Sequence, residues 1–184
     1  MRSRHANAVR RPMTIRVRRN RTLDERLAMQ FPRLRRVVAR ALWSLPERSR
    51  FRRAFLHRAV RLCIEAANRG DHDVAFALYA SDSESIFPPE LATLGERGPR
   101  GRVARVKWER KWRTEWGEFS YLPDEFVDLG DRILLLGRMT GSGVGSGAAV
   151  DTEWAMIITP VAGEVVREEV LFDRAEALKA VELV

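Results

Sequence analysis

The hydrophobic pattern changes its period near residue 117, and this change constrains the fold class. Before it, apolar residues recur at three- and four-residue spacing, as in amphipathic helices. After it, period-two alternation covers residues 119–127, 132–140, 150–159 and 164–172. Short turns at Leu129–Asp131 and Val161–Gly163 join neighbouring runs, so we expect antiparallel hairpins. The chain is predicted to be an α+β protein with helices packed on one curved antiparallel sheet.

Helical segments are expected both before and after the sheet. They are residues 23–46, Glu47–Asn68, Asp73–Tyr79, Val103–Trp116 and Asp173–Val181. Gly70 supplies a left-handed stop after the second of them. Asp173 and Glu176 supply a capping box for the last. Ser85–Phe87 is expected to be a brief additional strand.

Arginine is concentrated at the N-terminal end. Residues 1–61 carry 19 Arg, no Lys and three acids, whereas residues 62–184 have a net charge of −8. We expect residues 1–22 to be a disordered basic arm, because they show no sustained period. Residues 23–46 are expected to form an amphipathic helical extension, followed by the main domain at 47–184. The arm suits contact with nucleic acid or an anionic membrane, although a solvated tail explains the same composition.

Several classes of protein are disfavoured by the sequence. No apolar run approaches the ~18 residues that span a membrane, and no secretory signal follows the basic start. We therefore expect a cytoplasmic protein. Cys63 is the sole cysteine, which excludes an internal disulfide. The three histidines lack metal-ligand spacing, so no metal or other cofactor is expected.

Four short motifs, in this order, resemble the SnoaL-like branch of the nuclear transport factor 2-like superfamily. They are AANRGD at 66–71, EFVDLGDR at 125–132, LGRMTGSG at 136–143 and FDRAEAL at 172–178. The resemblance covers residues 50–183 and implies a cystatin-like α+β roll, a cone-shaped sheet around a pocket capped by helices. It also implies frequent dimers through the sheet. It implies no single activity, because members include polyketide cyclases, isomerases, dehydratases and epoxide hydrolases.

The catalytic sets of the characterised relatives are not matched. The resemblance places Gly137 and Met139 where epoxide hydrolase relatives carry an Arg and an Asp, and Val170 near their second Asp. No strand contains the His of the dehydratases, and no inward Asp corresponds to that of the cyclases. Whether the protein is an enzyme is therefore left open by the sequence.

Strand alternation indicates which side chains face the pocket. The last strand is ambiguous by pattern, and the resemblance favours the face that carries Glu168. Together with residues of the preceding helix, the predicted ligand-binding residues are Trp108, Trp112, Leu135, Met139, Thr152, Trp154, Met156, Val170 and Phe172. Packing of large residues on the sheet explains the tryptophans as well.

The opposite, convex face of the sheet is also apolar in the sequence. Its residues are predicted to be Leu134, Leu136, Val165 and Leu171. Such a face is too apolar to prefer water. We therefore expect a homodimer through the sheet.

Glu168 is the candidate catalytic residue, as the one carboxylate in an apolar cavity. Desolvation would favour its protonated form and suit it to general acid or base chemistry. Thr152 or a Trp indole would then hold a developing oxyanion. A position at the rim, or an ion pair with a neighbouring Arg, is the alternative.

The leading interpretation is a protein that binds an apolar or aromatic small molecule. Its chemistry, if it has any, would be proton abstraction next to a carbonyl, as in isomerases and cyclases. A second interpretation is a dimeric binding module whose arm contacts nucleic acid or membrane. A third is a domain whose pocket is filled by its own side chains.

Overall fold

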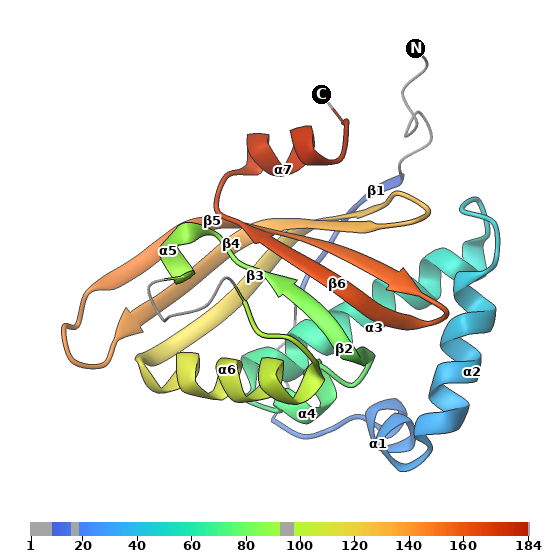
Figure 1. Cartoon of the computed structure of the whole chain (residues 1–184), viewed down its shortest axis with the longest axis horizontal. Coiled ribbons are helices and arrows are strands. Elements are labelled where there is room, and N and C mark those ends of the chain that lie inside the picture. Colours follow the sequence, from blue (N-terminus) through green and yellow to red (C-terminus); the bar gives the residue numbers. More distant parts are fainter. Residues whose placement is uncertain (1–8, 16–18, 93–97, 184) are drawn as a thin grey trace.

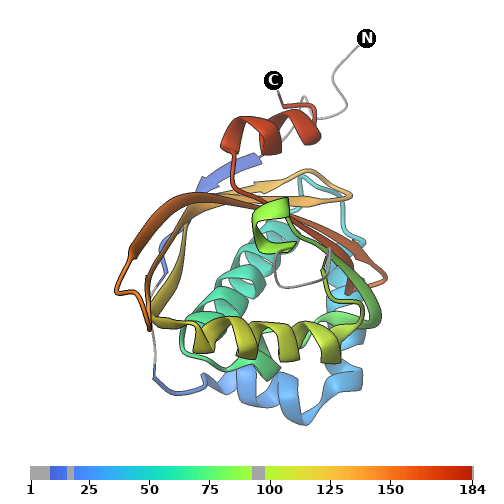
Figure 2. The ribbon, with the colours of Figure 1, turned by 60° about the vertical axis from the view of Figure 1, so that its left-hand side comes forward.

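The computed structural model describes residues 9–15, 19–92 and 98–183. In this part of the chain a six-stranded sheet, with strand order β1-β3-β4-β5-β6-β2, curves without closing (Figure 2). The antiparallel meander at its centre consists of β3 (Trp116–Asp128), β4 (Ile133–Gly143), β5 (Ala149–Val161) and β6 (Glu164–Leu171). The expected α+β class with a curved sheet is confirmed.

Several helices lie inside the curve of the sheet (Figures 1 and 2). They are α3 (Arg50–Asn68), α4 (His72–Ala75) and α6 (Arg102–Thr114), while the short α5 (Pro89–Ala92) follows the edge strand β2. Helix α3 buries Leu56, Val60 and Ile64 at four-residue spacing against the sheet. The main core of the protein therefore lies between α3, α6 and the concave face.

A bulge in β6 decides which of its side chains face the concave side. Val166 is one extra residue opposite Thr159–Pro160 of β5. As a result, Val165 and Val170 both belong to the main core. The sequence had placed Val165 on the convex face, and this was wrong because alternation was assumed to run unbroken along the strand. The inward direction expected for Glu168 and Val170 is observed.

The convex face of the sheet is covered by the chain itself. Helix α7 (Arg174–Ala180) lies across it (Figure 1), and Asp173 caps the helix by accepting a hydrogen bond from the Glu176 amide at 2.9 Å, as expected. Leu134 and Leu136 are fully buried in a second core beneath this helix. The expectation that these side chains are open to solvent was therefore wrong, because α7 covers them. The homodimer, which the family resemblance also implies, stays a prediction.

The edge strands differ most from expectation. Strand β2 (Tyr79–Ile86) is longer than the brief strand expected at Ser85–Phe87, and it pairs in parallel with β6. Strand β1 (Val9–Pro12) pairs antiparallel with β3, and Met13 is buried in the main core. Disorder was therefore the wrong expectation for this part of the arm, because the β3 edge and the core both hold it. Residues 1–8 and 16–18 of the arm lie outside the described residues.

Two helices form the expected helical extension. They are α1 (Leu23–Gln30) and α2 (Pro32–Trp43) (Figure 1). Thr22 and Glu25 form a capping box at the start of α1. The boundary between extension and domain at residues 46 and 47 stays a prediction. No helix among the described residues has the length and hydropathy to span a bilayer, and the cytoplasmic location also stays a prediction.

Candidate ligand cavity and its buried charge network

An internal cavity of about 70 Å³ lies inside the cone between α3, α4 and the sheet. Its walls are mainly apolar side chains of α3, β4 and β5, together with Trp43 from the end of α2. The polar side chains among the lining residues are Tyr79, Arg105 and Tyr121, with the thiol of Cys63. Such a lining, apolar with a few polar groups, is typical of small-molecule sites.

A second space of about 10 Å³ lies beside the cavity, in the part of the cone under α6. It shares Arg105, Tyr121, Trp154 and Met156 with the cavity. Most of the predicted ligand-binding residues surround it: Trp108, Trp112, Met139, Trp154, Met156, Val170 and Phe172. Leu135 lines the larger cavity, and Thr152 lines neither space. The structure thus brings the predicted residues together, apart from Thr152, but their own side chains fill most of the room between them. Their part in ligand binding stays a prediction.

A third space is a groove of about 260 Å³ among α1, α2 and α3. It shares Ala59, Cys63 and Leu78 with the inner cavity. Burial raises the pKa of the Cys63 thiol to about 12, so the thiol is protonated and unreactive near neutral pH. The three spaces follow one another, from the groove through the cavity to the aromatic end of the cone.

The aromatic end is built by one helix and two strands. Residues four apart on α6 lie one above another, which stacks Trp108 on Trp112 with ring centroids 5.5 Å apart and planes at 11°. Trp112 also meets the edge of Phe119 on β3, at 6.0 Å. Tyr121 then contacts Trp154 at 5.2 Å. This aromatic series closes one end of the cone.

The same face of α6 carries a second column of residues, and it is charged. Arg105, Glu109 and Arg113 are also four residues apart. Arg105 Nη1 lies 2.8 Å from Glu109 Oε2, and Arg113 Nε lies 3.5 Å from Glu109 Oε1. These charges point into the cone because a carboxylate from the sheet, Glu168, meets Arg105 there.

Glu168 is fully buried and has three donors. Its Oε2 accepts a hydrogen bond from the Tyr79 hydroxyl at 2.6 Å. Its Oε1 accepts one from the Ser85 hydroxyl at 2.6 Å and another from Arg105 Nε. Ser85 is in place because parallel β2 sets it opposite Glu168. The expectation of a lone carboxylate is therefore wrong, and the alternative of an Arg ion pair is observed. Glu168 lies behind the side chains that line the cavity.

Two positive and two negative charges balance inside the cone. Burial would lower the pKa of Arg105, but Glu168 and then Glu109 outweigh it and raise that pKa. Burial would likewise raise the pKa of Glu109, but Arg105 and then Arg113 hold it below its ordinary value. Both groups therefore stay charged. The Arg105 guanidinium also lies over the Phe76 ring, 4.3 Å from its centroid, which favours the cation.

The two cavity tyrosines stay protonated. Burial, and after it the nearby charge of Glu168, raises the pKa of Tyr79 well above its ordinary value. Burial, and after it Glu109, does the same to the pKa of Tyr121. The Tyr121 hydroxyl lies 3.2 Å from Glu109 Oε1. Each tyrosine hydroxyl thus donates a hydrogen bond to a carboxylate and leaves its oxygen lone pairs for other partners.

Six residues of this network were not singled out from the sequence. They are Tyr79, Ser85, Arg105, Glu109, Arg113 and Tyr121. One signal for three of them was available, since the four-residue column of charges on α6 runs beside the column of tryptophans. Charges at helical spacing usually face solvent. For this reason the charged column was not recognised as part of the interior.

The backbone around Gly137 explains why the Arg of the epoxide hydrolase relatives is absent here. A Cβ atom at this position would lie 2.3 Å from the Leu122 carbonyl oxygen and 2.5 Å from Pro123 Cα. Strand β3 approaches this closely where its register shifts between Pro123 and Glu125. No side chain fits at the position where the resemblance places the Arg of epoxide hydrolases. Among the described residues no cluster of three or more potential metal ligands occurs.

Solved structures of several bacterial proteins are similar to this fold. An NTF2-like protein of unknown function from Burkholderia pseudomallei is 27% identical, with a TM-score of 0.58 over 67% of this chain and 95% of that one. A protein with a ketosteroid isomerase-like fold from Catenulispora acidiphila, in complex with trimethylamine, is 13% identical, with a TM-score of 0.55 over 68% and 92%. A putative SnoaL-like polyketide cyclase from Jannaschia is 17% identical, with a TM-score of 0.55 over 76% and 99%.

The protein therefore has the fold of the nuclear transport factor 2-like superfamily. The expected resemblance to this superfamily is confirmed, and the Jannaschia structure shows that a SnoaL-like protein has the same fold. No protein-family model and no curated protein matches the chain. Proteins of this fold thus include one solved in complex with trimethylamine and one described as a putative polyketide cyclase.

Proposed function

We propose that the protein binds an apolar or aromatic small molecule inside the cone. The observation that carries this proposal is the cavity of about 70 Å³, with apolar walls and Tyr79, Arg105 and Tyr121 at its border. The hydroxyls of the tyrosines and the guanidinium already satisfy one another through Glu168 and Glu109. An apolar ligand can therefore enter without stripping hydrogen bonds from buried charges.

The cavity has to expand to hold a ligand of ordinary size. Sites for drug-sized molecules measure roughly 300–1,000 Å³, several times the present volume. Trp154 and Met156 separate the cavity from the aromatic space under α6. Methionine is flexible and repacks at small cost. A shift of these two side chains would join the spaces, with Trp108 and Trp112 as a flat wall for an aromatic ring.

Thermal unfolding with 2-naphthol and with indole tests the proposal. A ligand at about 100 times its Kd adds about 2.7 kcal/mol to the free energy of unfolding, so the unfolding temperature should rise. Ala59→Leu fills the passage between groove and cavity and should abolish the rise. Ala54→Leu, on the exposed side of the same helix, is the matched control and should keep it. The proposal fails if neither compound stabilises the wild type, or if Ala59→Leu responds as the wild type does.

We also infer a route for proton-transfer chemistry, as an isomerase or cyclase of a carbonyl compound would need. It is carried by the 2.6 Å hydrogen bond from Tyr79, which lines the cavity, to Glu168 behind it. The Tyr79 oxygen would take a proton from carbon next to a carbonyl while its own proton moves to Glu168. In this route Glu168 acts through Tyr79, and a Trp indole holds the oxyanion.

Deuterium exchange into 2-tetralone, measured by NMR, tests this second inference. The wild type should accelerate exchange next to the carbonyl, and Tyr79→Phe should remove the acceleration while 2-tetralone still raises the unfolding temperature. Exchange at the uncatalysed rate with bound 2-tetralone would leave the protein as a binder only.

A further inference from the structure

The apolar side of helix α2 faces solvent. Leu34 and Val37 are 60% and 64% exposed, and Val38 is 41% exposed. With Ala41, which is also exposed, they form a continuous row at three- and four-residue spacing. Helices of globular proteins normally bury such a row, whereas this row is exposed to solvent.

Helix α1 also exposes apolar side chains. Leu23 and Leu27 are exposed on it, and Phe31, at the junction with α2, is exposed as well. Of the described residues, these positions and the α2 row hold more than half of the large exposed hydrophobic side chains. We call the set Leu23, Leu27, Phe31, Leu34, Val37, Val38 and Ala41 the apolar ridge. A concentration of this kind marks an interaction site more often than chance exposure.

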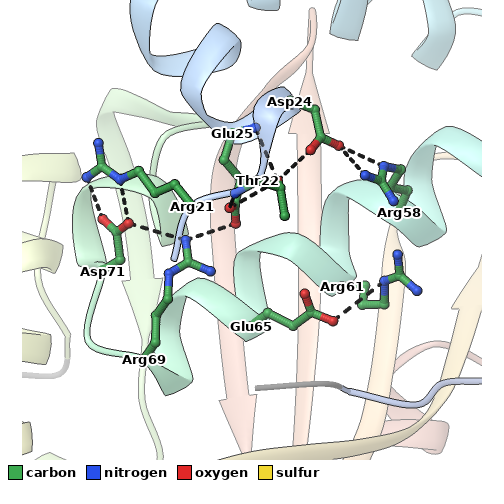
Figure 3. Close-up of polar contacts among 9 residues, drawn as sticks. All are labelled: Arg21, Thr22, Asp24, Glu25, Arg58, Arg61, Glu65, Arg69 and Asp71. Carbon is green, nitrogen blue, oxygen red and sulfur yellow. Dashed lines mark hydrogen bonds and ion pairs between the residues drawn. The ribbon is translucent and has the colours of Figure 1, made fainter. Parts of the chain in front are cut away.

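The polar side of α1 is fixed against the domain, so the orientation of α1 is determined (Figure 3). Asp24 pairs with Arg58 of α3 at 2.5 Å, and buried Glu25 pairs with Arg69 at 2.9 Å. Arg21, just before the helix, pairs with Asp71 at 2.6 Å. These contacts fix α1 on the domain through its acids and leave Leu23 and Leu27 exposed.

Helix α2 is fixed by its smallest residues and its backbone. Ala39 is buried, and a Cβ atom at Gly163 would lie 2.5 Å from the Arg40 amide nitrogen. Arg35 donates from Nη2 to the Ala77 carbonyl at 2.6 Å. The ridge is thus the outer side of a helix whose inner side is closely packed.

Most of the exposed charges on α1 and α2 are positive. The exposed charged residues of α1 and α2 are Arg26, Arg33, Arg36 and Arg40. Of the acids of these two helices, Glu25 is buried and pairs with Arg69, and the partly exposed Asp24 pairs with Arg58. Arg36 pairs with Glu164 of β6 at 2.8 Å. An apolar row flanked by arginines is the composition of helices that lie in the interface of an anionic bilayer.

We propose that α1 and α2 dock the protein on an anionic membrane surface, with the apolar ridge inserted among the lipid headgroups. The arginines that flank the ridge then face lipid phosphates. A second copy of this chain fits less well, because a symmetric contact sets the arginines of one copy against those of the other. Nucleic acid offers phosphates but gives the exposed leucines and valines no partner.

Vesicle co-sedimentation of the full chain tests the proposal. The protein should bind vesicles in which about a third of the lipid is phosphatidylglycerol, and bind far less to phosphatidylcholine alone, with salt weakening the binding. Leu34→Asp with Val37→Asp should weaken binding at least about tenfold. Arg33→Glu with Arg40→Glu should do the same on the anionic vesicles. Val103→Asp, at a 79% exposed position on α6, is the matched control and should bind as the wild type does.

Circular dichroism and the unfolding temperature establish that the variants are folded, and Leu34→Ser with Val37→Ser is the milder pair if the aspartates unfold the chain. Failure of the wild type to bind anionic vesicles overturns the proposal, as does unchanged binding by the folded ridge variants. Two further results also overturn it. One is binding to duplex DNA without binding to vesicles. The other is a dimer, by sedimentation velocity, that becomes a monomer when the ridge is changed.

Discussion

Arg105 is the central residue of the buried charge network inside the cone. It joins a carboxylate of the sheet, Glu168, to one of its own helix, Glu109. Removing one member of such a buried set leaves the opposite charge without compensation, which costs far more than the net stabilisation of the pair. Individual substitutions should therefore show large effects.

Glu168→Leu should lower the free energy of unfolding by about 3–5 kcal/mol, because Arg105 keeps only one of its two carboxylates. The neighbour Glu169, half-buried and paired with Arg167 near the surface, provides a control: Glu169→Gln should change the free energy by less than about 1 kcal/mol. Urea unfolding at neutral pH measures both. Equal effects of the two substitutions would contradict the burial of Glu168.

Acid should weaken the fold partly through Glu109. The pKa of Glu109 is held below its ordinary value of 4.5 by Arg105, against the effect of burial. Its contribution to stability is therefore complete above about pH 4.5 and is lost as the pH falls through the lower, folded-state pKa. Glu109→Gln should be less stable than the wild type at neutral pH and lose less stability between pH 5 and acid. Parallel pH profiles of unfolding free energy would contradict this assignment.

The directions of individual side chains could be predicted from the sequence, but the partners of Glu168 could not. Alternation along the strands correctly predicted that Leu135 and Trp154 point into the cone, whereas the inward direction of buried Glu168 was predicted from the family resemblance. The partners of Glu168 were not predictable in this way, because Arg105 is 63 residues distant and Tyr79 is 89. Only the tertiary fold brings these groups together, through a parallel edge strand whose pairing leaves no turn signal in the sequence.

At the scale of elements, the strands and helices with strong periodicity were predicted closely, and those held by other elements were not. The meander and α6 fall within a few residues of their expected bounds. Strand β1 has no pattern of its own and exists because the edge of β3 pairs with it. Helix α7 was expected, but its covering of the convex face was not.

Met13→Ala tests whether the segment after β1 belongs to the core. The Met13 side chain is buried among main-core residues, so its truncation should cost about 2 kcal/mol or more of unfolding free energy. Thr14→Ala, at the adjacent exposed position, should have little effect. No difference between the two would mean that this part of the arm is as loose as its composition suggests.

Ala177→Asp tests the cover provided by α7. Ala177 is fully buried against Leu134 and Leu136, so a carboxylate there should detach the helix and expose the convex face. Self-association should then increase, seen by sedimentation velocity as larger species. Ala175→Asp, on the exposed side of α7, should remain like the wild type. If α7 detached and the protein did not self-associate, the idea that α7 shields an aggregation-prone apolar face would be contradicted.

At the scale of the whole molecule, one helix takes part in two proposed functions. Helix α2 carries the outward part of the apolar ridge, and Trp43 at its end lines the cavity. Membrane docking and access to the cavity therefore involve the same element. If both proposals hold, anionic vesicles should change the rate at which 2-naphthol binds, and the ridge variants should remove that change while leaving affinity in solution unaltered. Stopped-flow fluorescence measures the rate.

The residues shared by the groove and the cavity, Ala59, Cys63 and Leu78, should affect the rates of ligand binding and release rather than the affinity. Side chains of α3 and of the segment after α4 lie between the inner cavity and the groove. If the proposed ligand passes this way, these side chains have to move apart before it can leave. Association and release are then slow together, and the residence time is long even for a ligand of modest Kd. A molecule acquired in the cell would outlast dialysis and travel with the protein through purification. Unfolding the purified protein and analysing the released small molecules by mass spectrometry is therefore a direct way to learn what it carries.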